Sequence, residues 1–137
     1  LGSELFQKEV EVLKTDRGSE FILANQIETR KDGTCRTRIF YCDPMASWKK
    51  GSLENVHILL REICPKGVDL KKLGLNSQIK ANIISSNINS YTKEKLNGKS
   101  SFQLMEFFNP EMIKKFASFG VSAIEPDNIA LKPYILK

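Results

Sequence analysis

The chain has 137 residues, of which 41% are hydrophobic and 27% charged, which fits one soluble globular domain with a modest core. Three cysteines, an odd number, and a single histidine argue against a secreted disulfide framework and against a zinc site of the usual Cys/His type. No apolar run approaches the roughly 18 residues of a membrane helix, and no signal peptide is visible. These features predict a cytoplasmic protein with free thiols and no membrane partner.

The formal charge of +5 is unevenly distributed along the chain. Residues 1–29 sum to −3, residues 30–72 to +5 and residues 73–137 to +3. A basic region favours a polyanionic partner, with nucleic acid as the first candidate. The alternative is the solvated surface of an ordinary basic protein.

Two strands are predicted in the first third of the chain. Leu1-Gly2-Ser3 is typical of the remnant of a cleaved expression fusion, so the native segment is expected to begin at Glu4. The alternating run VEVL at residues 10–13 predicts a strand that ends near residue 16, and Ser19 is a candidate N-cap for a short helix. After a turn at residues 32–33, the run RTRIFYC at residues 36–42 predicts a second strand, which Asp43-Pro44 ends.

A long amphipathic helix is predicted over residues 49–64, because proline and glycine follow it and two faces can be read from its periodicity. Its polar face carries Lys50, Glu54, His57 and Arg61 at helical spacing. The expected buried stripe comprises Leu53, Val56, Leu59, Leu60 and Ile63.

The remaining chain is expected to be mainly helical, with helices over residues 77–91, 100–108 and 110–119 and a turn at residues 97–98. Residues 125–137 are expected to form a strand or an extended tail. Strand, helix, strand and helix in this order indicate an α/β fold.

Two carboxylates stand where α/β proteins build their sites. Asp16 directly follows the first strand, and Glu54 lies early in the helix that follows the second strand. Carboxylates so placed can hold Mg²⁺, which prefers oxygen ligands and shares its shell with water and phosphate. Many α/β proteins have carboxylates near strand ends, so this spacing alone does not establish a metal site.

Several ordered motifs resemble a known family. TDRGSEF, FYCDPMASWKKGSLENVHILLR, PKGVDL and LNGKSSFQLM closely resemble segments of the integrase-core transposases of bacterial insertion sequences. The resemblance covers roughly residues 9 to 108. It implies a ribonuclease H-like fold, related in architecture to retroviral integrases, with extra C-terminal helices. On this basis residues 4–108 are expected to form a partial catalytic core and residues 109–137 a helical or extended C-terminal extension.

The resemblance also implies roles for particular residues. Asp16 and Glu54 match the second and third acidic residues of the DDE triad and would hold Mg²⁺ or Mn²⁺. The reaction implied is metal-assisted cleavage of DNA at the element's ends, followed by attack of the freed 3′-hydroxyl on target DNA. The expected partners are DNA and further copies of the chain, in the bacterial cytoplasm. The positions expected to contact DNA are Lys49, Lys50, Gly51, Asn55 and Arg61.

The chain also departs from the family pattern. The first triad aspartate belongs on an opening strand well before Asp16, and no acid in residues 4–15 has that context. We therefore expect a core truncated at its N-terminus, from a parent enzyme, and an isolated chain with little or no activity, because triad residues act as a unit. Two other hypotheses stay open: a non-catalytic DNA-binding or oligomerisation module derived from a transposase, and an unrelated small α/β protein.

Overall fold

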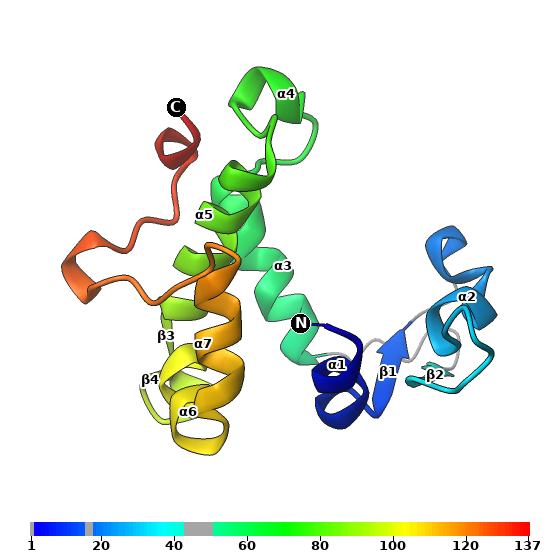
Figure 1. Cartoon of the computed structure of the whole chain (residues 1–137). Coiled ribbons are helices and arrows are strands. Elements are labelled where there is room, and N and C mark those ends of the chain that lie inside the picture. Colours follow the sequence, from blue (N-terminus) through cyan, green and yellow to red (C-terminus); the bar gives the residue numbers. More distant parts are fainter. Residues whose placement is uncertain (1, 16–17, 43–50) are drawn as a thin grey trace. The chain divides into compact units, whose positions relative to one another are not determined.

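A computed structural model describes residues 2–15, 18–42 and 51–137, with the side chains of all of these except Glu20 and residues 51–53. The chain is mixed α/β, with a few short strands and several helices (Figure 1). It forms two compact units, Leu1–Gly51 and Ser52–Lys137, termed unit 1 and unit 2. Within the described ranges, no helix is both long and apolar enough to cross a membrane.

Unit 1 is built around two parallel strands. β1 (Val12–Thr15) pairs with β2 (Arg38–Tyr41), and Thr15 lies opposite Tyr41. Two backbone hydrogen bonds extend the ladder, from Arg38 N to Glu11 O (3.0 Å) and from Cys42 N to Thr15 O (2.8 Å). Both predicted strands are confirmed, each over four residues. Because the pairing is parallel, both strands end at the same edge of the sheet.

The connection between these strands carries a 3₁₀ turn and a short α-helix, where one short helix was predicted. It contains the 3₁₀ turn η1 (Ser19–Phe21) and α2 (Ala24–Glu28). A carboxylate oxygen of Glu28 accepts a 2.7 Å hydrogen bond from Ile39 N, which ties α2 to β2. The expectation that Ser19 is an N-cap is wrong: Gly18 precedes η1, and no side chain caps that turn. The predicted turn at residues 32–33 is confirmed, with Gly33 at a positive φ of 82°.

A short N-terminal helix, α1 (Ser3–Glu9), contacts the connection through two arginines. Arg30 donates hydrogen bonds to the Ser3 carbonyl (3.1 Å) and to the Gln7 side chain. The guanidinium of Arg36 lies 4.9 Å from the centre of the Phe6 ring and donates to Ile27 O at 2.7 Å. These two basic residues therefore serve the packing of unit 1.

Unit 2 has an aliphatic core between two long helices and the C-terminus (Figure 1). The helices are α3 (Gly51–Ile63) and α5 (Gln78–Ser90), and the C-terminal 3₁₀ turn is η5 (Pro133–Leu136). The centre of the core comprises Ile63, Ile84, Ile88 and Leu136, all at most 6% exposed. The predicted helix of residues 49–64 is thus confirmed from residue 51, and the helix of residues 77–91 is confirmed with Ser77 as its N-cap.

The remaining elements of unit 2 lie around this core. The predicted helices α6 (Ser101–Phe108) and α7 (Pro110–Ser118) are confirmed and pack side by side. Several described elements of unit 2 were not predicted: α4 (Leu70–Leu73), β3 (Thr92–Lys93), η3 (Glu94–Leu96) and β4 (Lys99–Ser100). β3 and β4 form a small antiparallel hairpin. In unit 1, α1 was not predicted either. Residues 125–137 form an extended tail with two 3₁₀ turns, η4 (Pro126–Asn128) and η5, instead of a strand.

Candidate metal and nucleic-acid site

The helix α3 positions the candidate side chains because its apolar stripe fixes its rotation. Ile63 is fully buried, and Val56, Leu59 and Leu60 pack against the core around it. The 3.6-residue period then turns the remaining positions towards solvent. The polar face predicted from the sequence therefore exists along the described part of α3.

Three side chains of that polar face are exposed: Glu54, His57 and Arg61. Glu54 lies in the first turn of α3 and Arg61 in the last, about 10 Å apart along the helix axis. A carboxylate at the N-terminal end and a guanidinium near the C-terminal end both suit the helix dipole. Asn55, next to Glu54, is half-buried.

Several predicted site residues lie outside the described part of the chain. These residues are Asp16, Lys49 and Lys50. The predicted turn residue Asp43 also lies outside the described part. Gly51 is the first residue of α3. The structure thus brings Glu54, Asn55 and Arg61 onto one helix, and the other assignments stay predictions.

The described side chains do not form a complete metal centre. No group of three or more His, Cys, Asp or Glu residues gathers within the described ranges. Glu54 is an exposed oxygen donor, which suits Mg²⁺, and Mg²⁺ usually takes only one or two protein carboxylates. A centre built on Glu54 therefore needs further oxygen ligands.

The basic region of the sequence is divided between two uses. Arg30 and Arg36 are engaged within unit 1, as described above. The other described basic residues of this region are exposed: Lys31, Arg38, Arg61, Lys66, Lys71 and Lys72. The exposed cations of each unit can meet a polyanion, so charge alone overstates the number of available cations in this region by two.

Comparison with known proteins shows what the chain is similar to. A transposase for insertion sequence element IS1086 from Cupriavidus metallidurans is 35% identical over 68 residues, half of this chain. A transposase for element IS4351 from Bacteroides fragilis is 29% identical over 87 residues, 64% of the chain. Transposase InsI for element IS30A from Escherichia coli is 28% identical over 95 residues, 69% of the chain. The chain is related to the transposases of bacterial insertion sequences.

This transposase-related chain corresponds to a minor part of its relatives. The aligned regions span 19%, 24% and 23% of the length of those three transposases. No protein-family model matches the chain, and no solved structure matches it significantly.

The sequence analysis did not identify a set of polar residues on α5 that holds the C-terminal part of this transposase-related chain. Ser86, Asn87 and Ser90 of α5 are nearly buried, and each accepts a hydrogen bond from a backbone N–H of residues 119–137, here called the C-terminal segment. This segment in turn packs Leu131, Ile135 and Leu136 against α3 and α5. The available signal was the run ISSNINS (residues 84–90), which is too polar for a helix buried only by apolar contacts.

Proposed function

We propose that the chain is part of the catalytic core of a DDE transposase, with a ribonuclease H-like arrangement of strands. In this proposal Asp16 and Glu54 are ligands of Mg²⁺ or Mn²⁺ in a centre that cleaves and joins DNA during transposition. The relatives, all transposases by name, support the transposition-related part of the proposal. The metal-dependent chemistry rests on the resemblance of the motifs around the two acids.

One structural observation carries the proposal furthest, the parallel pairing of β1 and β2. A parallel pair needs a crossover connection, and its two strands end at one edge of the sheet, where open α/β sheets build their sites. Asp16 is the next residue after β1, and the chain leaving β2 leads to α3, whose first turn exposes Glu54. Both acids therefore follow strand ends, as the proposed chemistry requires.

The proposed DNA contacts extend along and before α3. Gly51 and Asn55 lie in the first turns of α3, and Lys49 and Lys50 directly precede Gly51 in the sequence. Backbone N–H groups at a helix start and positive charge attract phosphate. Arg61, exposed two turns beyond Glu54, offers a planar guanidinium that can hold a second phosphate with two hydrogen bonds. These contacts would position the DNA strand without reading its sequence.

These side chains and the metal would have different roles in the reaction. When bound, the metal supplies an activated nucleophile and neutralises charge that develops on the phosphate. Glu54 holds a fixed negative charge at the helix start, and the lysines and Arg61 place the phosphodiester beside it. The chain supplies orientation and electrostatics, with no covalent enzyme intermediate.

A second candidate is a non-catalytic DNA-binding or oligomerisation module derived from a transposase. The large exposed apolar residues of both units favour it, because such surfaces are typical of association. It shares the DNA partner with the first candidate and differs in having no metal-dependent step.

The first test of the two candidates is nicking of supercoiled plasmid in Mg²⁺ and in Mn²⁺. Nicking that is lost in Asp16→Asn and Glu54→Gln, yet kept in Glu106→Gln, supports the enzyme. Glu106 is a suitable control because it is an exposed glutamate on α6. Absence of nicking alone supports neither candidate, because an isolated core fragment is expected to have little or no activity. A folded chain that binds DNA in a salt-sensitive way, without nicking and without Mn²⁺ binding that depends on Glu54, supports the non-catalytic module. Binding that does not weaken with salt contradicts both.

A further inference from the structure

A groove of about 550 Å³ lies in unit 2 between α3, the end of α5 and the C-terminal segment. Its walls are mainly apolar and include Ile58, Tyr91, Ile129 and Leu131. Ile58 is 57% exposed and Tyr91 41% exposed, so both offer apolar surface to a binding partner. Pockets of this size accept bulky apolar groups.

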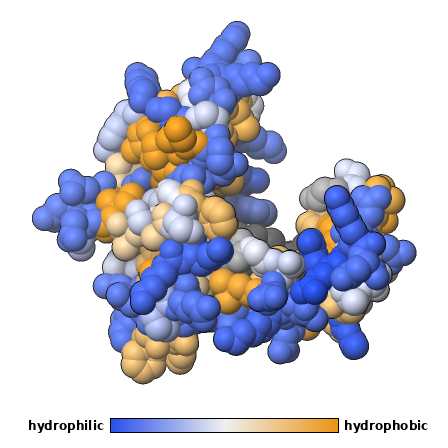
Figure 2. Space-filling model, viewed as in Figure 1, coloured by the Kyte–Doolittle hydropathy of each residue, from blue (hydrophilic) through white to orange (hydrophobic). Residues whose placement is uncertain are grey.

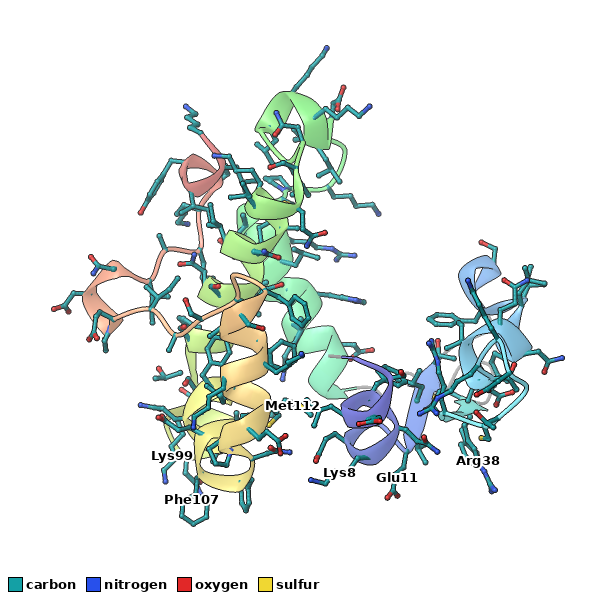
Figure 3. All side chains as sticks on the ribbon, in the orientation of Figure 1. Lys8, Glu11, Arg38, Lys99, Phe107 and Met112 are labelled. Atoms are coloured by element: carbon teal, nitrogen blue, oxygen red, sulfur yellow. The ribbon has the colours of Figure 1, made fainter. Side chains whose placement is uncertain are left out.

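Unit 2 also carries a projecting pair of aromatic rings, Phe107 and Phe108, here called the aromatic tip. They are 81% and 76% exposed, and Figure 3 shows Phe107 pointing away from the rest of unit 2. Figure 2 shows this end of unit 2, below α6 and α7, as an apolar projection. Such exposure means that the aromatic tip does not fill the groove of its own chain.

The aromatic tip is held in a defined position. Its rings pack edge to face, with centroids 5.1 Å apart and planes at 86°. The helix end behind them is fixed by a 2.7 Å hydrogen bond from Asn109 N to Met105 O, and the Asn109 side chain then caps α7. A pre-positioned aromatic pair loses little conformational entropy on binding, as anchor residues of interfaces do.

We propose that the aromatic tip of one chain inserts into the groove of a second copy, and that the aromatic tip of the second copy inserts into the groove of the first. Such a reciprocal arrangement closes as a two-fold dimer. Each Phe side chain offers roughly 150 Å² or more, so two tips and two grooves bury on the order of 1,000 Å², the lower edge for a specific interface. The dimer is therefore weak, with a dissociation constant in the micromolar range or above.

The contact bears on the proposed function without depending on it. Ile58 lies one helical turn after Glu54 on α3, so an inserted tip contacts the helix that carries the proposed metal ligand. The lining is mainly apolar and also includes Glu62 and Lys132, which form a 3.4 Å ion pair with each other. The exposed Arg61 stays outside the groove lining. Dimerisation is thus measurable without DNA or metal.

Sedimentation equilibrium of the 137-residue chain tests the proposal. The wild type should dimerise below about 1 mM protein, and the tip variant Phe107→Ala/Phe108→Ala and the groove variant Ile58→Glu should each weaken dimerisation at least about tenfold. Ile79→Ala is the matched control, because Ile79 is 71% exposed in unit 2 and lies outside both surfaces. Circular dichroism confirms that each variant is folded.

Mixing the two variants gives the sharpest outcome. The groove variant still has an intact tip and the tip variant an intact groove, so a mixture should form heterodimers through one remaining contact. This association should be weaker than that of the wild type and stronger than that of either variant alone. A tip that packs on a second tip would give no such rescue, and that result overturns the proposal. A wild type that stays monomeric throughout, or a groove variant that dimerises normally, overturns it as well.

Discussion

The side chain of Asn87 on α5 joins two distant parts of unit 2. Its Oδ1 accepts a 2.8 Å hydrogen bond from the backbone N–H of Ala130, and its Nδ2 donates to Ile83 O at 2.9 Å. Asn87 is only 3% exposed, so both groups would be unsatisfied without these partners. The neighbouring Ser86 and Ser90 accept from Ser122 N (3.1 Å) and Ile124 N (2.9 Å). The C-terminal segment is therefore held by side chains that satisfy its backbone.

Replacing Asn87 with alanine should destabilise unit 2 by about 1–3 kcal/mol, because the part-buried Ala130 N–H loses its acceptor. Urea unfolding measures the loss. Asn89→Ala is the control, since the Asn89 amide bonds only to Ser85 O within α5, and its effect should stay within about 0.5 kcal/mol. Equal losses in the two variants would contradict the role of Asn87.

Gly74 should tolerate no side chain because the C-terminal segment passes directly over it. Gly74 has a φ of 113°, and a Cβ there would lie 2.2 Å from Leu136 O. Gly74→Ala should therefore lower the unfolding free energy by more than the roughly 1–2 kcal/mol expected from backbone conformation alone. Gly67→Ala isolates that backbone effect, since Gly67 has a φ of 83° and open space around it.

The side chain of Leu136 tests the docking of the same C-terminal segment. It is 1% exposed in the core, so Leu136→Ala should lower the unfolding free energy by about 2–5 kcal/mol. Gly74→Ala would press on the Leu136 carbonyl, and Leu136→Ala removes the side chain that docks the same segment in the core. Both changes therefore weaken docking of one segment, so the double variant should lose less than the sum of the two single losses. Additive losses in urea unfolding would show that the two sites are independent.

The environment of Lys93 should make the unfolding free energy depend on pH. Its ammonium donates to Ser101 Oγ at 2.7 Å and to Ile88 O at 3.3 Å, and burial lowers its pKa. Between the folded pKa and the unfolded value of about 10.4, the unfolded chain keeps a proton that the folded chain has released. The unfolding free energy therefore rises with pH in that interval.

Comparing Lys93→Met with the wild type from about pH 8 to about pH 10.4 isolates this effect. The stability of the wild type should rise relative to that of the variant as pH increases. Lys95→Met, at an exposed position in η3, should keep a constant offset from the wild type. A constant offset for Lys93→Met would contradict the prediction.

Much of the fold could be predicted from local patterns, and the failures have physical causes. The stripe from Leu53 to Ile63 predicted α3, and α5 and α7 were predicted close to their observed bounds. The structure shows that Ser77 and Asn109 are the N-caps of α5 and α7. α4 was missed because its four residues carry no full period, although Asp69 caps it. The docking of the C-terminal segment was missed because it depends on hydrogen bonds across the fold, which sequence spacing does not encode.

The candidate site was predictable to a similar degree. The periodicity of α3 correctly predicted that Glu54 and Arg61 are exposed, because burial of the opposite apolar stripe fixes the rotation of the helix. Asp16, Lys49 and Lys50 lie outside the described residues, so their roles stay predictions. The use of Arg30 and Arg36 within unit 1 could not be foreseen, since it requires tertiary contacts with α1.

The central claim is that Asp16 and Glu54 are ligands of a divalent metal, and paramagnetic broadening by Mn²⁺ tests it most directly. In the ¹H–¹⁵N spectrum, substoichiometric Mn²⁺ should broaden the amide signals of Thr15 and Asn55, which neighbour the two acids. Glu54→Gln should remove the broadening at both positions, and Glu106→Gln should leave it unchanged. Broadening at only one position, or broadening that persists in Glu54→Gln, would contradict the claim.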